Sequence, residues 1–98
     1  MPQVIFAPSA LRDMERLRGF LRPKNPAAAK HAAATIIKTI KTLEDYPEIG
    51  RPADEMDPTY RELLIGYGDS GYVALYRYNG QSVTVIAIRH QKETGFFD

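Results

Sequence analysis

The stretch from residue 60 to residue 93 constrains the fold most, because it predicts three consecutive β-strands. Residues 60–67, 72–78 and 82–90 form runs rich in β-branched and aromatic side chains. Between the last two runs stands Asn79-Gly80, the strongest short hairpin signal that a sequence offers. Single cations interrupt these otherwise apolar runs, and each of them needs a partner, a phosphate or open water.

A two-residue turn at Asn79-Gly80 predicts the register of the last two strands. It sets Tyr78 opposite Gln81 and Tyr76 opposite Val83. One face then carries Tyr72, Ala74, Tyr76, Val83, Val85, Ala87 and Arg89, and the other carries Val73, Leu75, Arg77, Thr84, Ile86, Ile88 and His90. Because both faces are largely apolar, we expect covers on both sides, one of them a partner protein.

The N-terminal half predicts a short strand followed by a helical hairpin. Residues 3–6 suit an opening strand, and residues 9–22 show helical spacing of apolar side chains with Ser9 as the expected N-cap. Asn25-Pro26 is a start signal for a second helix over residues 26–45. Residues 47–58 read as a loop, and Gly68 to Gly71 as a turn.

The expected fold is therefore a single α+β domain over residues 1–98. Its elements follow the order β-α-α-β-β-β, with an antiparallel sheet packed on the helical hairpin. A chain of 98 residues is large enough for one modest core. It lacks cysteine, a signal-peptide pattern and any apolar run of membrane-spanning length, so we expect a cytoplasmic protein without membrane contact.

Charge is distributed unevenly along the chain. Residues 1–42 hold eight Lys/Arg and two Asp/Glu, whereas residues 43–69 hold two and eight. The basic third could face nucleic acid or an acidic protein partner, or it could be the solvated outer face of two helices.

The sequence predicts neither a metal site nor a cofactor site. The two histidines lie on different elements, and no glycine-rich phosphate loop precedes a helix. What remains is a set of cations in the loop and on the sheet: Arg51, Arg61, Arg77, Arg89 and His90.

Those cations allow two interpretations. Arginines gathered on one sheet could bind a phosphodiester while His90 acts as general acid or base. Alternatively, Arg61 and Arg77 pair with Glu62, Glu93 or a partner's carboxylate, and Arg89 and His90 lie at a fraying strand end. In the expected register Arg89 faces away from Arg77 and His90 unless a bulge intervenes, which favours the second interpretation.

The aromatic residues also allow two interpretations. Four tyrosines, Tyr67, Tyr72, Tyr76 and Tyr78, could form a stacking platform for bases, but aromatic residues in strands more often pack in the core, as we expect for Tyr72 and Tyr76. The adjacent Phe96 and Phe97 either tuck onto the core or stay exposed for a target.

Taken in order, several short motifs resemble the RelE/ParE superfamily of toxins from type II toxin–antitoxin systems, and specifically its ParE branch. The motifs are Ala7-Pro8-Ser9-Ala10 with Asp13, Asn25-Pro26-Ala27-Ala28, residues 43–47, Gly50-Arg51-Pro52, Arg61-Glu62-Leu63 with Tyr67-Gly68, Gly71-Tyr72-Val73, Leu75-Tyr76-Arg77 and Ala87-Ile88-Arg89-His90-Gln91-Lys92-Glu93. The family fold, a strand, a helical hairpin and a three-stranded antiparallel run, agrees with the fold expected above.

The resemblance implies a bacterial toxin that a cognate ParD-like antitoxin neutralises. ParE-like toxins inhibit DNA gyrase by stabilising its cleaved-DNA complex, which blocks replication without catalysis by the toxin. RelE-like toxins instead cut mRNA on the ribosome with basic residues and an acid/base group. The absence of lysine between Thr42 and Gln91, and of tyrosine after Tyr78, weakens the nuclease alternative. A second alternative is a non-toxic module that only binds its antitoxin.

The resemblance also implies roles for individual residues. No catalytic residue is expected for a gyrase inhibitor, whereas a nuclease would use Arg61, Arg77, His90 and Arg89. The segment expected to bind the target contains Arg89, His90, Lys92, Phe96 and Phe97, with exposed parts of the first helix. The residues expected to bind the antitoxin are Arg61, Arg77 and Tyr76. Sequence-specific DNA binding is expected only through the antitoxin.

Overall fold

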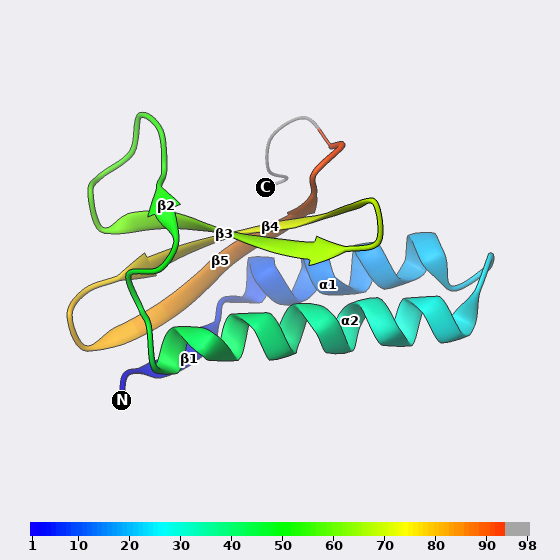
Figure 1. The fold of residues 1–98 in the computed structure, drawn as a ribbon, viewed down its shortest axis with the longest axis horizontal. Coiled ribbons are helices and arrows are strands. Elements are labelled where there is room, and N and C mark those ends of the chain that lie inside the picture. Colours follow the sequence, from blue (N-terminus) through cyan, green and yellow to red (C-terminus); the bar gives the residue numbers. More distant parts are fainter. Residues whose placement is uncertain (94–98) are drawn as a thin grey trace.

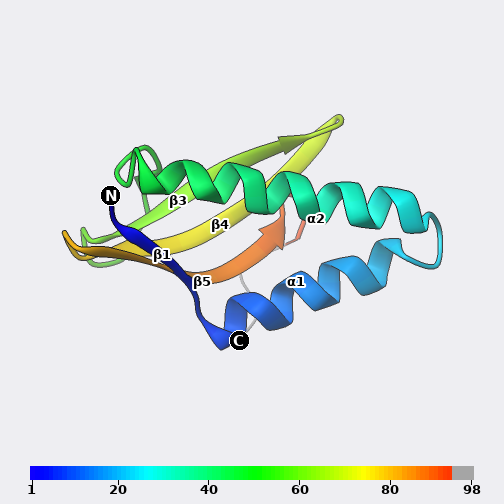
Figure 2. The ribbon, with the colours of Figure 1, turned by 90° about the horizontal axis from the view of Figure 1, so that it is seen from below.

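A computed structural model describes residues 1–93 of the chain. Within them the elements are β1 (Gln3–Phe6), α1 (Pro8–Leu21), α2 (Pro26–Lys41), a short 3₁₀ helix (Thr42–Glu44), β2 (Arg51–Pro52), β3 (Tyr60–Tyr67), β4 (Ser70–Tyr78) and β5 (Ser82–His90). The strands form one sheet in the order β1-β5-β4-β3-β2. Both helices cover the same face of that sheet, as Figure 2 shows. The expected α+β fold is confirmed, with β2 added inside the expected loop.

Helix α1 begins one residue earlier than its sequence pattern predicts. Pro8 occupies the first turn and Ala7 is the N-cap, so the expected capping role of Ser9 is wrong. Proline suits the first turn because its φ is fixed and it has no N–H to leave unsatisfied. The Ser9 hydroxyl instead donates a hydrogen bond to the carbonyl of Ile86, which ties the start of α1 to β5.

Helix α2 begins as predicted. The Asn25 side chain accepts a hydrogen bond from the Ala28 N–H at 3.1 Å, and Pro26 stands in the first turn. Ala29, Ala32 and Ala33 are buried early in the helix. These small side chains let α1 and α2 approach closely as an antiparallel pair, which Figure 1 shows beneath the sheet.

The strand β1 joins the sheet edge in parallel with β5, pairing Val4 with Val83 and Phe6 with Val85. The remaining neighbours, β2 with β3, β3 with β4 and β4 with β5, are antiparallel. The expected antiparallel sheet is therefore a mixed sheet with one parallel edge strand.

The predicted register of the β4–β5 hairpin is wrong. Tyr78 pairs with Val83 and Tyr76 with Val85, so the loop has four residues rather than two. The cause is the Asn79 side chain, whose oxygen accepts hydrogen bonds from the N–H groups of Gln81 at 2.9 Å and Ser82 at 2.8 Å. This side-chain turn competes with the two-residue backbone turn.

A β-bulge then shifts the pairing a second time. The register changes between Leu75 and Tyr76, and beyond it Leu75 pairs with Ala87 and Tyr72 with His90. A bulge adds one residue to one strand, which reverses the face of every side chain that follows. Ile88 and His90 consequently lie on the helix face of the sheet, and Arg89 lies on the other.

The two-residue turn of this sheet lies between β3 and β4. Tyr67 pairs with Ser70, which leaves Gly68 and Asp69 as the turn. Gly68 has φ of 62°, a left-handed conformation that glycine adopts without steric cost.

The main core fills the space between the sheet and the helices. Its largest fully buried side chains are Tyr76, Ile36, Ile40, Leu43, Ile65, Ile88, Val83 and Val85. A second, smaller cluster lies on the open face, where Ala53, Leu75 and Ala87 pack with Tyr60 and Ile86. The segment around β2 thus covers part of the face for which we expected a partner protein.

Candidate functional site

The bulge decides which of the expected site residues share a face of the sheet. Arg77 and Arg89 both lie on the open face of the sheet. Arg77 follows Leu75 by two residues on β4 and therefore shares its face, and Arg89 of β5 pairs with Val73. His90 pairs with Tyr72 on the helix face, and Arg61 pairs with Tyr76 on that face too. The expected grouping of Arg77 with His90, away from Arg89, is therefore wrong.

Arg61 and Tyr76 organise the loop before β2. One guanidinium nitrogen of Arg61 donates to the carbonyls of Gly50 at 2.7 Å and Glu48 at 3.2 Å. The Tyr76 hydroxyl donates to the carbonyl of Pro47 at 2.8 Å. Burial raises the pKa of the Tyr76 hydroxyl above its ordinary value of 10.0, so it stays a neutral donor at physiological pH.

Gly50 is required where this loop crosses Tyr76. Its N–H donates to the Tyr76 hydroxyl at 3.0 Å, and a Cβ built on Gly50 would lie 2.7 Å from the same hydroxyl. Tyr76 is fully buried. It supports the loop through its hydroxyl and has no exposed surface of its own. Its expected role in antitoxin binding therefore stays a prediction.

Arg77 belongs to a short chain of polar contacts on the open face. Its Nε donates to the Thr59 hydroxyl at 3.2 Å, and that hydroxyl donates to Asp57 at 2.6 Å. The hydrogen bond from the Thr59 hydroxyl is the main cause that lowers the pKa of the Asp57 carboxyl, with the Thr59 N–H and the charge of Arg77 adding to it. The Arg77 side chain stays exposed beside the Tyr60 ring.

Both ring nitrogens of His90 have hydrogen-bond partners. The Lys92 N–H donates to Nδ1 at 3.1 Å, so Nδ1 is an acceptor. The ring proton then sits on Nε2, 3.0 Å from the Ser70 hydroxyl oxygen. The ring also packs edge-on against Tyr72, with centroids 5.2 Å apart.

A network that the sequence pattern did not predict ties α1 to the end of β5. Buried Asp13 accepts a hydrogen bond from the Ile88 N–H at 2.8 Å and lies 3.5 Å from Arg16. Arg16 pairs in turn with Glu93, whose other oxygen accepts from the His90 N–H at 2.8 Å. An available signal was the position of Asp13, an acid inside the apolar stripe of α1.

Arg89 closes the turn that follows β5. One guanidinium nitrogen lies 3.4 Å from the carbonyl oxygens of His90 and Gln91, and 3.2 Å from that of Glu93. Lys92 stands in the same turn with its side chain exposed. Phe96 and Phe97, the other residues expected to bind the target, lie outside the described residues.

The aromatic side chains form a packed row rather than an open platform. Tyr72 and Tyr76 are buried, which confirms their expected packing role. Tyr67 contacts Tyr72 at 6.2 Å and His31 of α2 at 5.6 Å between ring centroids. Tyr78 packs against the main core.

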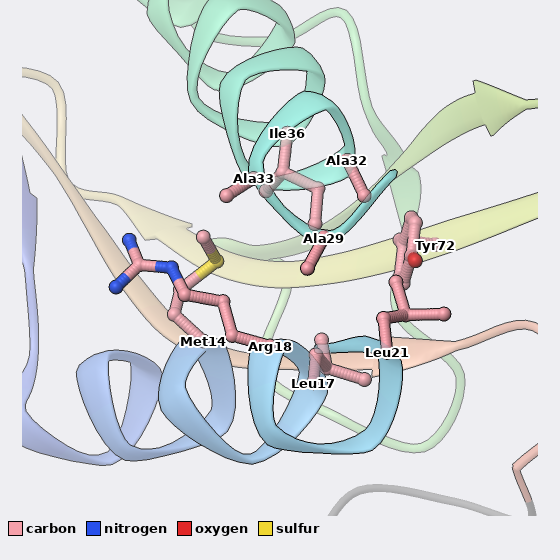
Figure 3. Close-up of a pocket in the computed structure, with 9 residues that line it drawn as sticks. All are labelled: Met14, Leu17, Arg18, Leu21, Ala29, Ala32, Ala33, Ile36 and Tyr72. Carbon is pink, nitrogen blue, oxygen red and sulfur yellow. The ribbon is translucent and has the colours of Figure 1, made fainter. Parts of the chain in front are cut away.

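Two hollows involve the helical hairpin. The first lies between both helices and the sheet, and Figure 3 shows its apolar lining with Tyr72 on one side and the guanidinium of Arg18 on the other. The second is a groove lined by residues of both helices: Arg18, Arg22, Pro26, Ala29, Lys30 and Ala33.

Among residues 1–93 no group of three potential metal ligands comes together. No helix in that range is long and apolar enough to cross a membrane.

A sequence profile of the family described as the ParE toxin of the type II toxin–antitoxin system parDE matches residues 4–95. The chain belongs to this ParE family. It is accordingly a toxin of a type II toxin–antitoxin system and a member of the RelE/ParE superfamily.

Curated relatives include Toxin RelE3 of Caulobacter vibrioides, which is 33% identical over 93 residues, covering 95% of this chain and 98% of that protein. Toxin RelE1 of the same organism is 36% identical over 92% of this chain and 94% of its own length.

A solved structure supports the ParE fold independently. The chain is similar to one titled "Chromosomal ParDE TA system from P. aeruginosa", with a TM-score of 0.77 and 20% sequence identity. The similarity covers 92% of this chain and 96% of the other. At that identity the likeness concerns the arrangement of helices and strands.

Proposed function

We propose that a cognate ParD-like antitoxin holds this ParE-family chain inactive, and that the free chain inhibits DNA gyrase. In this proposal the toxin stabilises the cleaved-DNA complex of gyrase in the bacterial cytoplasm and blocks replication, with no reaction catalysed by the toxin. The family match over residues 4–95 supports the ParE assignment.

The observation that carries this proposal is the separation of the expected catalytic cations. Phosphodiester cleavage needs cations and an acid/base group that converge on one reacting phosphate. Here Arg61 contacts loop carbonyls, and Arg89 contacts carbonyls of the turn after β5. His90 lies on the helix face and Arg77 on the open face. Within the described residues these groups do not converge, which favours a binding protein over a nuclease.

An antitoxin would find exposed apolar side chains and open strand edges on this fold. Ile5 on β1 and Leu64 on β3 are large exposed apolar residues of the sheet. Strand β2 pairs only with Arg61 and Glu62, so the rest of the outer edge of β3 has no strand neighbour among residues 1–93. An extended segment can add to such an edge through main-chain hydrogen bonds. Exposed Arg77 would then meet acidic residues of the antitoxin.

A supercoiling assay tests the gyrase proposal. Purified chain should block supercoiling by gyrase, and addition of the ParD-like antitoxin should restore it. Expression without the antitoxin should induce DNA-damage signalling. Normal supercoiling with a large molar excess of folded chain would contradict the proposal. Harmless expression of a folded chain would leave antitoxin binding as its only role.

A ribosome-dependent mRNA endoribonuclease is the second candidate, because the curated relatives carry the name RelE. It predicts rapid translation arrest that is lost on His90→Ala or Arg61→Ala. Since Arg61 also holds the loop before β2, the thermal stability of Arg61→Ala must be measured alongside. Ser70→Ala is a matched control, because it removes the partner of His90 Nε2 and keeps the ring. Toxicity unchanged in both His90→Ala and Arg61→Ala would contradict this candidate.

A further inference from the structure

The outer side of the helical hairpin carries a basic groove near the turn between α1 and α2. Arg18 and Arg22 line it from α1 and Lys30 from α2, and its floor consists of Pro26, Ala29 and Ala33. Figure 2 shows this end of the hairpin extending beyond the strands. The groove therefore lies away from the strand edges on which antitoxin binding is placed above.

The positive charge of this groove is only partly balanced within the hairpin. Glu15 lies 3.5 Å from Arg18 and 3.4 Å from Arg22, so one carboxylate faces two guanidinium groups. Asp13, the only other acid in residues 1–42, is buried on the opposite side toward β5. Lys30 is exposed, and the same segment adds Arg12, Lys24, Lys38 and Lys41 to the exposed surface.

The apolar side chains that line the groove, Pro26, Ala29 and Ala33, are all small. Ala29 is 4% exposed and Ala33 is 8% exposed, so a helix laid on them would bury almost no further apolar area. Helix-in-groove binding depends on large apolar anchors that fill pockets. The exposed apolar residues of α1, Leu11 and Phe20, are not among the residues that line the groove. An amphipathic helix is therefore a poor match.

Duplex DNA matches the same features well. Its backbone presents closely spaced negative charges, and Lys and Arg contacts to it release counterions without requiring apolar contact. Arginine also binds phosphate oxygens bidentately. Single-stranded nucleic acid needs aromatic side chains for base stacking, and no aromatic residue lines the groove.

We propose that the groove formed by Arg18, Arg22 and Lys30 binds the phosphodiester backbone of duplex DNA without sequence preference. This surface goes beyond the proposed function, because it acts without gyrase and without the antitoxin. For a toxin acting on DNA-bound gyrase, it would add a contact to the DNA beside the enzyme.

The test is fluorescence anisotropy of labelled duplex DNA of random sequence with the full chain free of antitoxin, over a series of salt concentrations. The variant Arg18→Gln/Arg22→Gln/Lys30→Gln should bind about 100-fold more weakly near 0.1 M salt, and its log–log salt slope should be shallower by about 2.7, or roughly 0.9 per lost phosphate contact. The matched control Lys38→Gln/Lys41→Gln/Arg51→Gln removes three exposed cations outside the groove, changes net charge equally and should bind like the parent chain.

A second variant keeps the test independent of any loss of stability. Glu15→Gln removes the exposed acid beside the groove and should tighten DNA binding a few-fold with an unchanged melting temperature. Equal binding by the two triple variants, or no tightening in Glu15→Gln, would overturn the proposal. Tighter binding of duplex RNA than of duplex DNA would overturn the assignment to DNA. Because gyrase is absent, a chain that fails here and still inhibits gyrase loses only this inference.

Discussion

The Tyr76 hydroxyl accepts a hydrogen bond from the Gly50 N–H at 3.0 Å, and a Cβ on Gly50 would lie 2.7 Å from that hydroxyl. The carbonyl oxygen of Glu62 would lie 2.8 Å from the same added Cβ. A buried tyrosine and a glycine therefore set the path of the chain from α2 into β2, next to the open face on which we place antitoxin binding.

Gly50→Ala should destabilise the fold by about 1–3 kcal/mol, because the added methyl group overpacks a site that leaves it no room. Thermal unfolding measures this change. Gly19→Ala is the matched control, since a Cβ there meets nothing within 4 Å and the residue lies within α1. The control should gain about 0.5–1 kcal/mol in stability from the better helix former. Equal stability of the two variants would contradict the tight contact with Tyr76.

Tyr76→Phe should cost about 1–3 kcal/mol, because it removes the acceptor of the buried Gly50 N–H and the donor to Pro47 together. Tyr67→Phe makes the same chemical change where the hydroxyl has one 3.3 Å bond to the Ala28 carbonyl, and it should cost less. Chemical denaturation of both variants makes the comparison. A smaller loss for Tyr76→Phe than for Tyr67→Phe would argue against the loop anchor.

Stability should fall as pH rises above about 10. Burial raises the pKa values of the Tyr72 and Tyr76 hydroxyls above the ordinary 10.0, so the folded state keeps protons that the unfolded state loses. The stability from this difference is fully present below the ordinary pKa and is lost at higher pH. Stability is measured by unfolding at a series of pH values above about 10 in the parent chain and in Tyr76→Phe. It should fall less steeply with pH in the variant. Identical slopes would rule out Tyr76 as a source.

Asp13→Ala should destabilise the fold by about 2–3 kcal/mol, because it leaves the buried Ile88 N–H without its acceptor. It also removes one of the acids beside Arg16. Glu15→Ala, two residues along the same helix, removes an exposed acid and should stay within about 0.5 kcal/mol. Equal losses in the two variants would show that the contact between α1 and β5 adds no stability.

Much of the fold could be predicted because local signals and tertiary structure agree. Asn25-Pro26 starts α2 as expected, since its capping needs only neighbouring residues. The β4–β5 register failed because the Asn79 side chain captured two backbone N–H groups and a bulge followed. Neither feature has a signature in the hydrophobic pattern, which allows both registers.

The arrangement of the candidate site was less predictable than the fold. Which face Arg89 and His90 occupy depends on that one bulge. The sequence predicted that Arg61 pairs with a carboxylate. It could not predict that this carboxylate is Glu48, 3.8 Å away, or that the carbonyls of Glu48 and Gly50 accept from the same side chain, because these contacts span more than ten residues. Asp13 could have been singled out, because an acid within an apolar stripe requires a buried partner.

The central claim, inhibition of gyrase, is tested most directly by a DNA cleavage assay with purified gyrase. Circular DNA is incubated with gyrase and the chain, with the chain omitted in one control and the ParD-like antitoxin added in another. The account predicts linear DNA that accumulates only when free chain is present and disappears when the antitoxin is added. No linear DNA from folded chain at large molar excess would contradict the account and direct the search for the target to the ribosome.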